Sequence, residues 1–310
     1  MKRPIGEVLR RGFESAIANW PLIALRIAEN MLFAILIIAS IIAAVVPLLV
    51  SIGLSAFNVD KPEESAANIG AALIEHLAVF LWIALGAIVL LFLLLVIHSF
   101  VIAGCAQTFV DADRSERLKV FSMERWLSGG KHSMWTVFWI YNITYSTTLI
   151  VVLVPAVVTI AALLAYRGSE KAVLACAGCF GAAATVFLLI ISLIVAAIWS
   201  LKAIILAVER NLGASDATKL AWAESKADFG RHFAVAFILF VISFGGAMAI
   251  GMFSIFFSMP SAHNTYMSLA FAPARMVISV LQSIFSAAVG MWMLASFAAL
   301  SDTSSVSSRA

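Results

Sequence analysis

The sequence predicts an all-α membrane protein with six spanning helices, arranged as three hairpins that are each preceded by a short amphipathic helix at the cytoplasmic surface. Three observations support this prediction: an apolar composition, six long apolar runs, and three similar polar segments in front of alternate runs. Of the 310 residues, 63% are hydrophobic and 12% are charged, and the mean hydropathy is +1.05. An average soluble domain carries about 25% charged residues, so this composition indicates a chain that lies in a bilayer.

The six apolar runs are each long enough to cross a membrane as a helix. A bilayer core of about 30 Å is crossed by roughly 20 helical residues, and the backbone must satisfy its own hydrogen bonds there. The runs cover residues 31–54, 77–103, 134–166, 172–208, 233–259 and 276–300. An even number of spans places both termini on one side. The first run is longer than the core of a signal peptide, so we expect the amino terminus to be retained.

The basic residues are distributed unevenly between the two sides that this topology defines. Positively charged loops resist translocation, so the side that carries them is cytoplasmic. One side holds 16 Lys and Arg residues and the other holds four, namely Lys61, Arg167, Lys171 and Arg275. We therefore expect both termini in the cytoplasm. Because acidic residues are mixed among the basic ones, the charge indicates a solvated face that meets membrane lipids rather than nucleic acid.

Three cytoplasmic segments resemble one another and suggest an internal repeat. Each contains an aromatic residue followed six positions later by a polar one, before an apolar run begins. These pairs are Phe13 and Asn19, Trp126 and His132, and Trp222 and Asp228. We expect a single domain over residues 1–300, with pseudo-repeats near 1–107, 108–208 and 209–300, and a disordered tail over 301–310.

Each repeat is expected to begin with a helix that lies on the membrane surface. Tryptophan rings favour headgroup depth, so Trp20, Trp126 and Trp222 are predicted interfacial anchors. The turn into the membrane is expected at Pro21, at Gly129 and Gly130, and at Gly230 in the three repeats, because proline suits the first turn of a helix and glycine suits tight turns.

Polar residues within or at the ends of the apolar runs are the candidates for function, because such groups are costly in a bilayer. In the predicted topology they all fall in the cytoplasmic half and form a candidate cluster: Arg26, Glu29, Asn30, His98, Asn142, Lys202 and Glu209. One interpretation is a set of ion pairs and snorkelling side chains. A second is a proton or solute pathway, helped by helices that bend at Pro47 and Pro155. A third is a set of single contacts that anchor the helices to lipid headgroups.

The sequence contains no motif that indicates catalysis or a cofactor. Motifs such as HExxH, the P-loop and GxSxG are absent. Cys176 and Cys179 have redox spacing, and they are interpreted either as packing residues or as an oxidisable pair. Glu224 and Asp228 lack further ligands for a cation. We therefore predict no catalytic residues, no metal and no cofactor.

The segment "ERNLGASDATKLAWAESKADF" from Glu209 resembles a signature of bacterial six-helix membrane proteins related to the membrane domain of glycerophosphoryl diester phosphodiesterase. The matching positions are Glu209, Gly213, Ala217, Ala221, Trp222 and Phe229, and the segment "LRRGFESAIANWPL" resembles the opening of that group. The resemblance implies a location in a bacterial inner membrane. It implies no enzyme activity here, since catalysis in the phosphodiesterases belongs to a separate soluble barrel.

Three functional hypotheses follow, in decreasing order of support from the sequence. The first is a non-enzymatic scaffold or accessory component that acts on lipids or on other membrane proteins. The second is a transporter for a small solute or a lipid that uses the polar cluster. The third, an intramembrane enzyme, would need a nucleophile or metal site that the sequence does not display.

Overall fold

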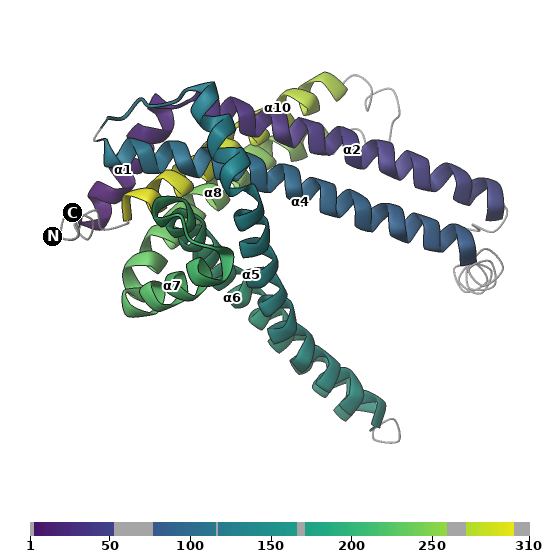
Figure 1. The fold of residues 1–310 in the computed structure, drawn as a ribbon. Coiled ribbons are helices and arrows are strands. Elements are labelled where there is room, and N and C mark those ends of the chain that lie inside the picture. Colours follow the sequence, from purple (N-terminus) through teal and green to yellow (C-terminus); the bar gives the residue numbers. More distant parts are fainter. Residues whose placement is uncertain (1–2, 53–76, 116, 166–170, 259–270, 301–310) are drawn as a thin grey trace. The chain divides into compact units, whose positions relative to one another are not determined.

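The computed structural model describes residues 3–52, 77–115, 117–165, 171–258 and 271–300. Within these ranges every regular element is a helix (Figure 1). The eight described helices are α1 (Ile5–Ala18), α2 (Pro21–Ile52), α4 (Leu77–Arg114), α5 (Met123–Ala165), α6 (Lys171–Arg210), α7 (Ala214–Ala227), α8 (Phe229–Ser258) and α10 (Ala272–Leu300). The expectation of an all-α chain is confirmed for the described residues.

Six of these helices, all except α1 and α7, are long and apolar enough to cross a membrane. Their most apolar 18-residue windows have mean hydropathies from 1.8 to 3.1, and only 6–22% of the residues in those windows are buried. Apolar exposure on this scale is a liability in water, whereas lipid chains are as apolar as the side chains themselves. The described chain is thus a multi-pass membrane protein, and each expected apolar run falls on one of the six helices.

The chain forms two compact units, which are considered one at a time. One consists of residues 25–98, and the other of residues 1–24 together with 99–310. In the first unit, α2 and the beginning of α4 lie side by side (Figure 1) and are joined by polar contacts between Glu29 and His98. The second unit contains α1, the end of α4, and helices α5 to α10.

The second unit brings α1 against α10, although the two helices are far apart in the sequence. Gly12 of α1 sits so close to Ser296 that a Cβ atom there would lie 2.8 Å from the backbone of Ser296. The indole N–H of Trp292 donates a hydrogen bond to the carbonyl of Leu9 at 2.9 Å. The rings of Phe13 and Trp292 meet edge to face with centroids 5.0 Å apart. Small residues thus let the backbones approach while aromatic rings fill the flanks.

Glycines also bring the end of α4 close to the beginning of α5. A Cβ on Gly104 would lie 2.6 Å from the carbonyl oxygen of Trp126, and one on Gly130 would lie 2.8 Å from the ring of Phe100. The expected turn at Gly129 and Gly130 is therefore wrong: α5 runs unbroken from Met123 through both glycines. They serve close packing instead, and among the described residues no separate short helix precedes α5.

The short helices α1 and α7 each bury one side and end at a turn before a long helix. The buried residues of α7 are Ala217, Thr218, Ala221 and Ser225, a stripe with helical spacing. α2 begins at Pro21, as expected. The turn after α7 is at Asp228, because α8 already begins at Phe229 and includes Gly230. Asn19 and Asp228, the paired polar positions of two predicted repeats, therefore both terminate a short helix.

Two glycines of α1 provide a matched test of the contact between α1 and α10. Replacing Gly12 by alanine forces a methyl group into the backbone of Ser296, and overpacking of this kind costs about 1–3 kcal/mol. Gly6 has nothing within 4 Å of its Cβ position, so Gly6→Ala should be neutral or stabilising, since alanine favours helix. We expect Gly12→Ala, and not Gly6→Ala, to lower the unfolding temperature of the purified protein in detergent. Equal unfolding temperatures would contradict the close α1–α10 contact.

Candidate functional site

The seven residues of the candidate polar cluster are divided between the two units. Arg26, Glu29, Asn30 and His98 belong to the unit of residues 25–98, whereas Asn142, Lys202 and Glu209 belong to the other. The contacts within each unit are therefore described separately.

In the first unit, Glu29 is the centre of a three-residue contact. Its side chain is 1% exposed and one carboxylate oxygen contacts Arg26, one turn earlier on α2. The other oxygen lies 2.8 Å from Nδ1 of His98 on α4. The same Nδ1 lies 2.7 Å from Nη1 of Arg26. Asn30, the next residue along α2, is half-buried.

His98 can satisfy only one of its two neighbours at a time through Nδ1. If Nδ1 carries a proton, it donates to Glu29; if it carries a lone pair, it accepts from Arg26. The carboxylate and the guanidinium neutralise each other in either case, which reduces the cost of holding charge away from water. Glu29 is therefore paired with Arg26 in either tautomer of His98.

In the second unit, Lys202 forms an ion pair with a residue that the sequence had not linked to it. Its side chain is 3% exposed, and its ammonium lies 3.0 Å from Oε2 of Glu224 on α7. Nη2 of Arg210 reaches the other oxygen of Glu224 at 3.1 Å. Both cations come from α6, one at its buried part and one at its end. Glu224 therefore holds α7 against α6.

Asn142 and Glu209 make local contacts in the same unit. The side-chain amide of Asn142 donates to the carbonyl of Phe138 one turn earlier, at 2.9 Å. The main-chain carbonyl of Glu209 accepts a hydrogen bond from Arg114 of α4. The Glu209 side chain is buried, and its Oε2 has no hydrogen-bond partner among the described residues.

The three predicted tryptophan anchors differ in their surroundings. Trp20 and Trp222 are 65% and 49% exposed, as a ring at headgroup depth would be. Trp126 is 7% exposed and packs edge to face against Phe100, with centroids 5.3 Å apart. Trp126 thus contributes to the packing of α4 against α5.

Sequence reasoning did not identify the importance of Asn19, which is fully buried. Its amide donates to the carbonyls of Ser15 at 2.8 Å and Leu118 at 2.6 Å. Its oxygen accepts from the backbone N–H groups of Val120 and Phe121 at 3.0 and 2.9 Å. Asn19 therefore ends α1 and fixes the segment that leads into α5. The repeat spacing from Phe13 pointed to this position, but not to its partner.

Asp113, near the end of α4, was also missed. Oδ1 accepts hydrogen bonds from Arg3 at 2.7 Å and from Arg11 at 2.8 Å. Arg3 further donates to the carbonyl of Ala299, at the end of α10, at 3.1 Å. The Asp113 carboxylate thus links the end of α4 to α1 and, through Arg3, to the end of α10. A lone acidic residue among many charges in a loop gave no signal of this role.

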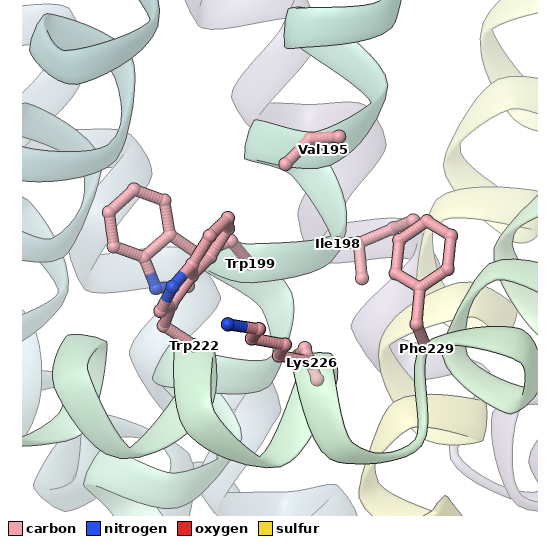
Figure 2. A pocket seen from close by; sticks show the side chains of 7 residues that line it. Val195, Ile198, Trp199, Trp222, Lys226 and Phe229 are labelled. Carbon is pink, nitrogen blue, oxygen red and sulfur yellow. The ribbon is translucent and has the colours of Figure 1, made fainter.

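A hollow of about 210 Å³ lies where α6, α7 and the start of α8 meet (Figure 2). Its lining residues are Val195, Ile198, Trp199, Trp222, Ser225, Lys226 and Phe229. Trp199 and Trp222 stand side by side with ring centroids 5.3 Å apart, and the indole N–H of Trp199 donates to the carbonyl of Thr218 at 2.7 Å. In Figure 2 the amino group of Lys226 points toward these indoles.

Metal and thiol chemistry receive no support from the described part of the chain. There, no three His, Cys, Asp or Glu residues are grouped so that they could hold a metal ion. Cys105 is buried in α4. Cys176 and Cys179 belong to α6, but their side chains lie outside the described residues.

No protein-family model, no curated protein and no solved structure matches this chain. The helices and their polar contacts define the class of the protein: an all-helical, multi-pass integral membrane protein.

The ion pair between Lys202 and Glu224 can be tested by charge removal. Glu224→Gln leaves the buried ammonium of Lys202 without its carboxylate. Because the Glu224 side chain is itself 31% exposed, we expect a cost of about 1–3 kcal/mol, less than the cost of breaking a fully buried pair. Arg210→Ala removes the more exposed cation and should cost no more than about 1 kcal/mol. The double variant Lys202→Met with Glu224→Gln should recover part of the loss. Thermal unfolding in detergent measures all three, and a harmless Glu224→Gln would contradict the buried pair.

Proposed function

We propose that this protein is a non-enzymatic scaffold or accessory component of a bacterial inner membrane, acting on lipids or on partner membrane proteins. Its six spans form three hairpins, the hairpins follow surface-lying segments, and both termini are cytoplasmic. The distribution of 16 basic residues on one side and four on the other supports this orientation.

The observation that carries the proposal is the pairing of two buried charges of the candidate cluster, Glu29 and Lys202. Glu29, 1% exposed, is held by Arg26 and His98, and Lys202, 3% exposed, is held by Glu224. A transport pathway needs polar groups that meet water and a solute. Charges that form ion pairs with one another instead hold helices together, as expected of a structural component.

The likeness to the six-helix relatives of the phosphodiesterase membrane domain is part of this proposal. It rests on the sequence from Glu209 to Phe229, where α6 ends, α7 begins after a short turn, and Trp222 precedes α8. The repeated placement of Asn19 and Asp228 at the ends of α1 and α7 supports the internal repeat.

Transport of a small solute or a lipid is the second candidate, and one observation favours it. His98 has two alternative partners within hydrogen-bond distance, Arg26 at 2.7 Å and Glu29 at 2.8 Å. A histidine placed between an acidic and a basic side chain in two neighbouring spans is typical of the polar relays of transporters.

Flux measurements distinguish the two candidates. We expect proteoliposomes that contain the protein to take up protons and small solutes no faster than protein-free vesicles. We also expect Glu29→Gln and Lys202→Ala to change stability rather than flux. A flux that depends on the protein and is reduced at least tenfold by either substitution would overturn the scaffold proposal and favour transport.

Labelling of single cysteines tests the proposed topology. Lys119→Cys lies in the exposed segment between α4 and α5, and we expect it to react with a membrane-impermeant thiol reagent only after cells are opened. In a background without the natural cysteines, Lys61→Cys serves as the matched position on the opposite side and should react in intact cells. Reversed labelling would invert the topology.

A further inference from the structure

A second hollow in the same unit adjoins the one between α6 and α7. It has a volume of about 80 Å³ and lies between α6 and α8, with one side chain from α10. Its lining includes Ile194, Leu201, Phe237, Phe240 and Met293. Ile198 lines both hollows, so the two adjoin at this residue, and the pair is called the trough below.

The two ends of this trough differ in chemistry. The end between α6 and α8 is lined only by hydrocarbon and aromatic side chains. The end at α7 is also apolar over nearly all of its surface, but it is bordered by the two indoles, by Lys226 and by Ser225. Ser225 is 6% exposed, and its Oγ has no hydrogen-bond partner among the described residues. A buried hydroxyl without a partner is costly unless a ligand completes it.

The positive charge of Lys226 is not compensated by its neighbours. Of the two nearby carboxylates, Glu224 is occupied by Lys202 and Arg210, and Asp228 lies 3.8 Å from Arg231. No ion pair of Lys226 occurs within the described residues. Beside α7 the trough thus has the unpaired ammonium of Lys226 and the unsatisfied hydroxyl of Ser225 close to aromatic rings. Elsewhere its lining is apolar.

We propose that this trough is the seat of one anionic phospholipid from the surrounding membrane. Its acyl chain lies along α6 and α8, and its phosphate faces Lys226 and Ser225 at the level of Trp199 and Trp222. The proposal rests on the proposed function, of which it specifies the lipid partner. A choline headgroup is disfavoured although indoles attract quaternary ammonium, because the Lys226 ammonium points toward the same rings.

The size of the trough agrees with a chain rather than with an enclosed small molecule. Sites that enclose drug-sized ligands have volumes of about 300–1,000 Å³, whereas the two hollows measure about 210 and 80 Å³. A lipid chain needs only a furrow, since the rest of its surface meets other lipids. The lining residues of the second hollow on α6 and α8 belong to two candidate membrane spans.

Photo-crosslinking of the full-length protein tests this assignment. The probes are phosphatidylglycerol and phosphatidylcholine, each with a diazirine on one acyl chain, in vesicles otherwise identical in composition. We expect phosphatidylglycerol to label peptides covering residues 194–201 and 233–240 at least fivefold more than phosphatidylcholine does. Lys226→Gln should reduce that labelling about fivefold, the factor expected for one cation at a membrane surface. Ser225→Ala should reduce it by a smaller factor.

Lys219→Gln is the matched control, because Lys219 is an exposed lysine on the same helix that does not line the trough. It should leave the labelling unchanged. Labelling spread evenly over all six spans, equal labelling by both lipids, or equal effects of the two lysine substitutions would overturn the proposal. Occupation of the trough by a second copy of the chain in place of lipid, detected as crosslinks between two chains, would also overturn it. Flux through proteoliposomes, by contrast, would overturn only the scaffold function, so the two failures are distinguishable.

Discussion

The buried ammonium of Lys202 is costly without a carboxylate beside it, and that carboxylate comes from another helix. Its side chain is 3% exposed and its partner is Glu224 of α7. The cost of an unpaired buried charge is several kcal/mol, so α7 is held where Glu224 can reach. That position brings Trp222 against Trp199 and forms the hollow between α6 and α7. The trough proposed as a lipid seat thus depends on the contacts that hold α7 against α6, among which the pair of Lys202 and Glu224 is the most buried.

The same constraint operates at the other buried acids that hold several donors. Asp113 accepts from Arg3 and Arg11, and through Arg3 it is linked to the end of α10. Glu29 is shared by Arg26 and His98. Apolar side chains give little preference for one helix neighbour over another in lipid. Polar groups with few possible partners, together with glycines that permit close approach, therefore determine which helices meet.

The sequence predicted the features that depend on composition and local chemistry. The six apolar helices and the start of α2 at Pro21 follow from hydropathy and from the missing N–H of proline. The partner of Lys202 was not predictable, because it depends on how α7 docks and not on spacing along α6. Gly129 and Gly130 were misread as a turn for a similar reason. Glycine serves turns and close packing alike, and only the approach of Phe100 and Gln107 decides between them.

The contact between α1 and α10 has a consequence for the biosynthesis of the chain. Trp292 and Leu9, which this contact joins, are separated by 283 residues. Ribosomes add about 5–20 residues per second, so α1 waits roughly 15–60 s for its partner after it leaves the ribosome. During that interval the close-packing face around Gly12 is uncovered. Chains that stop short of α10 never cover it, so the close packing of α1 is completed only when synthesis of the chain is nearly finished.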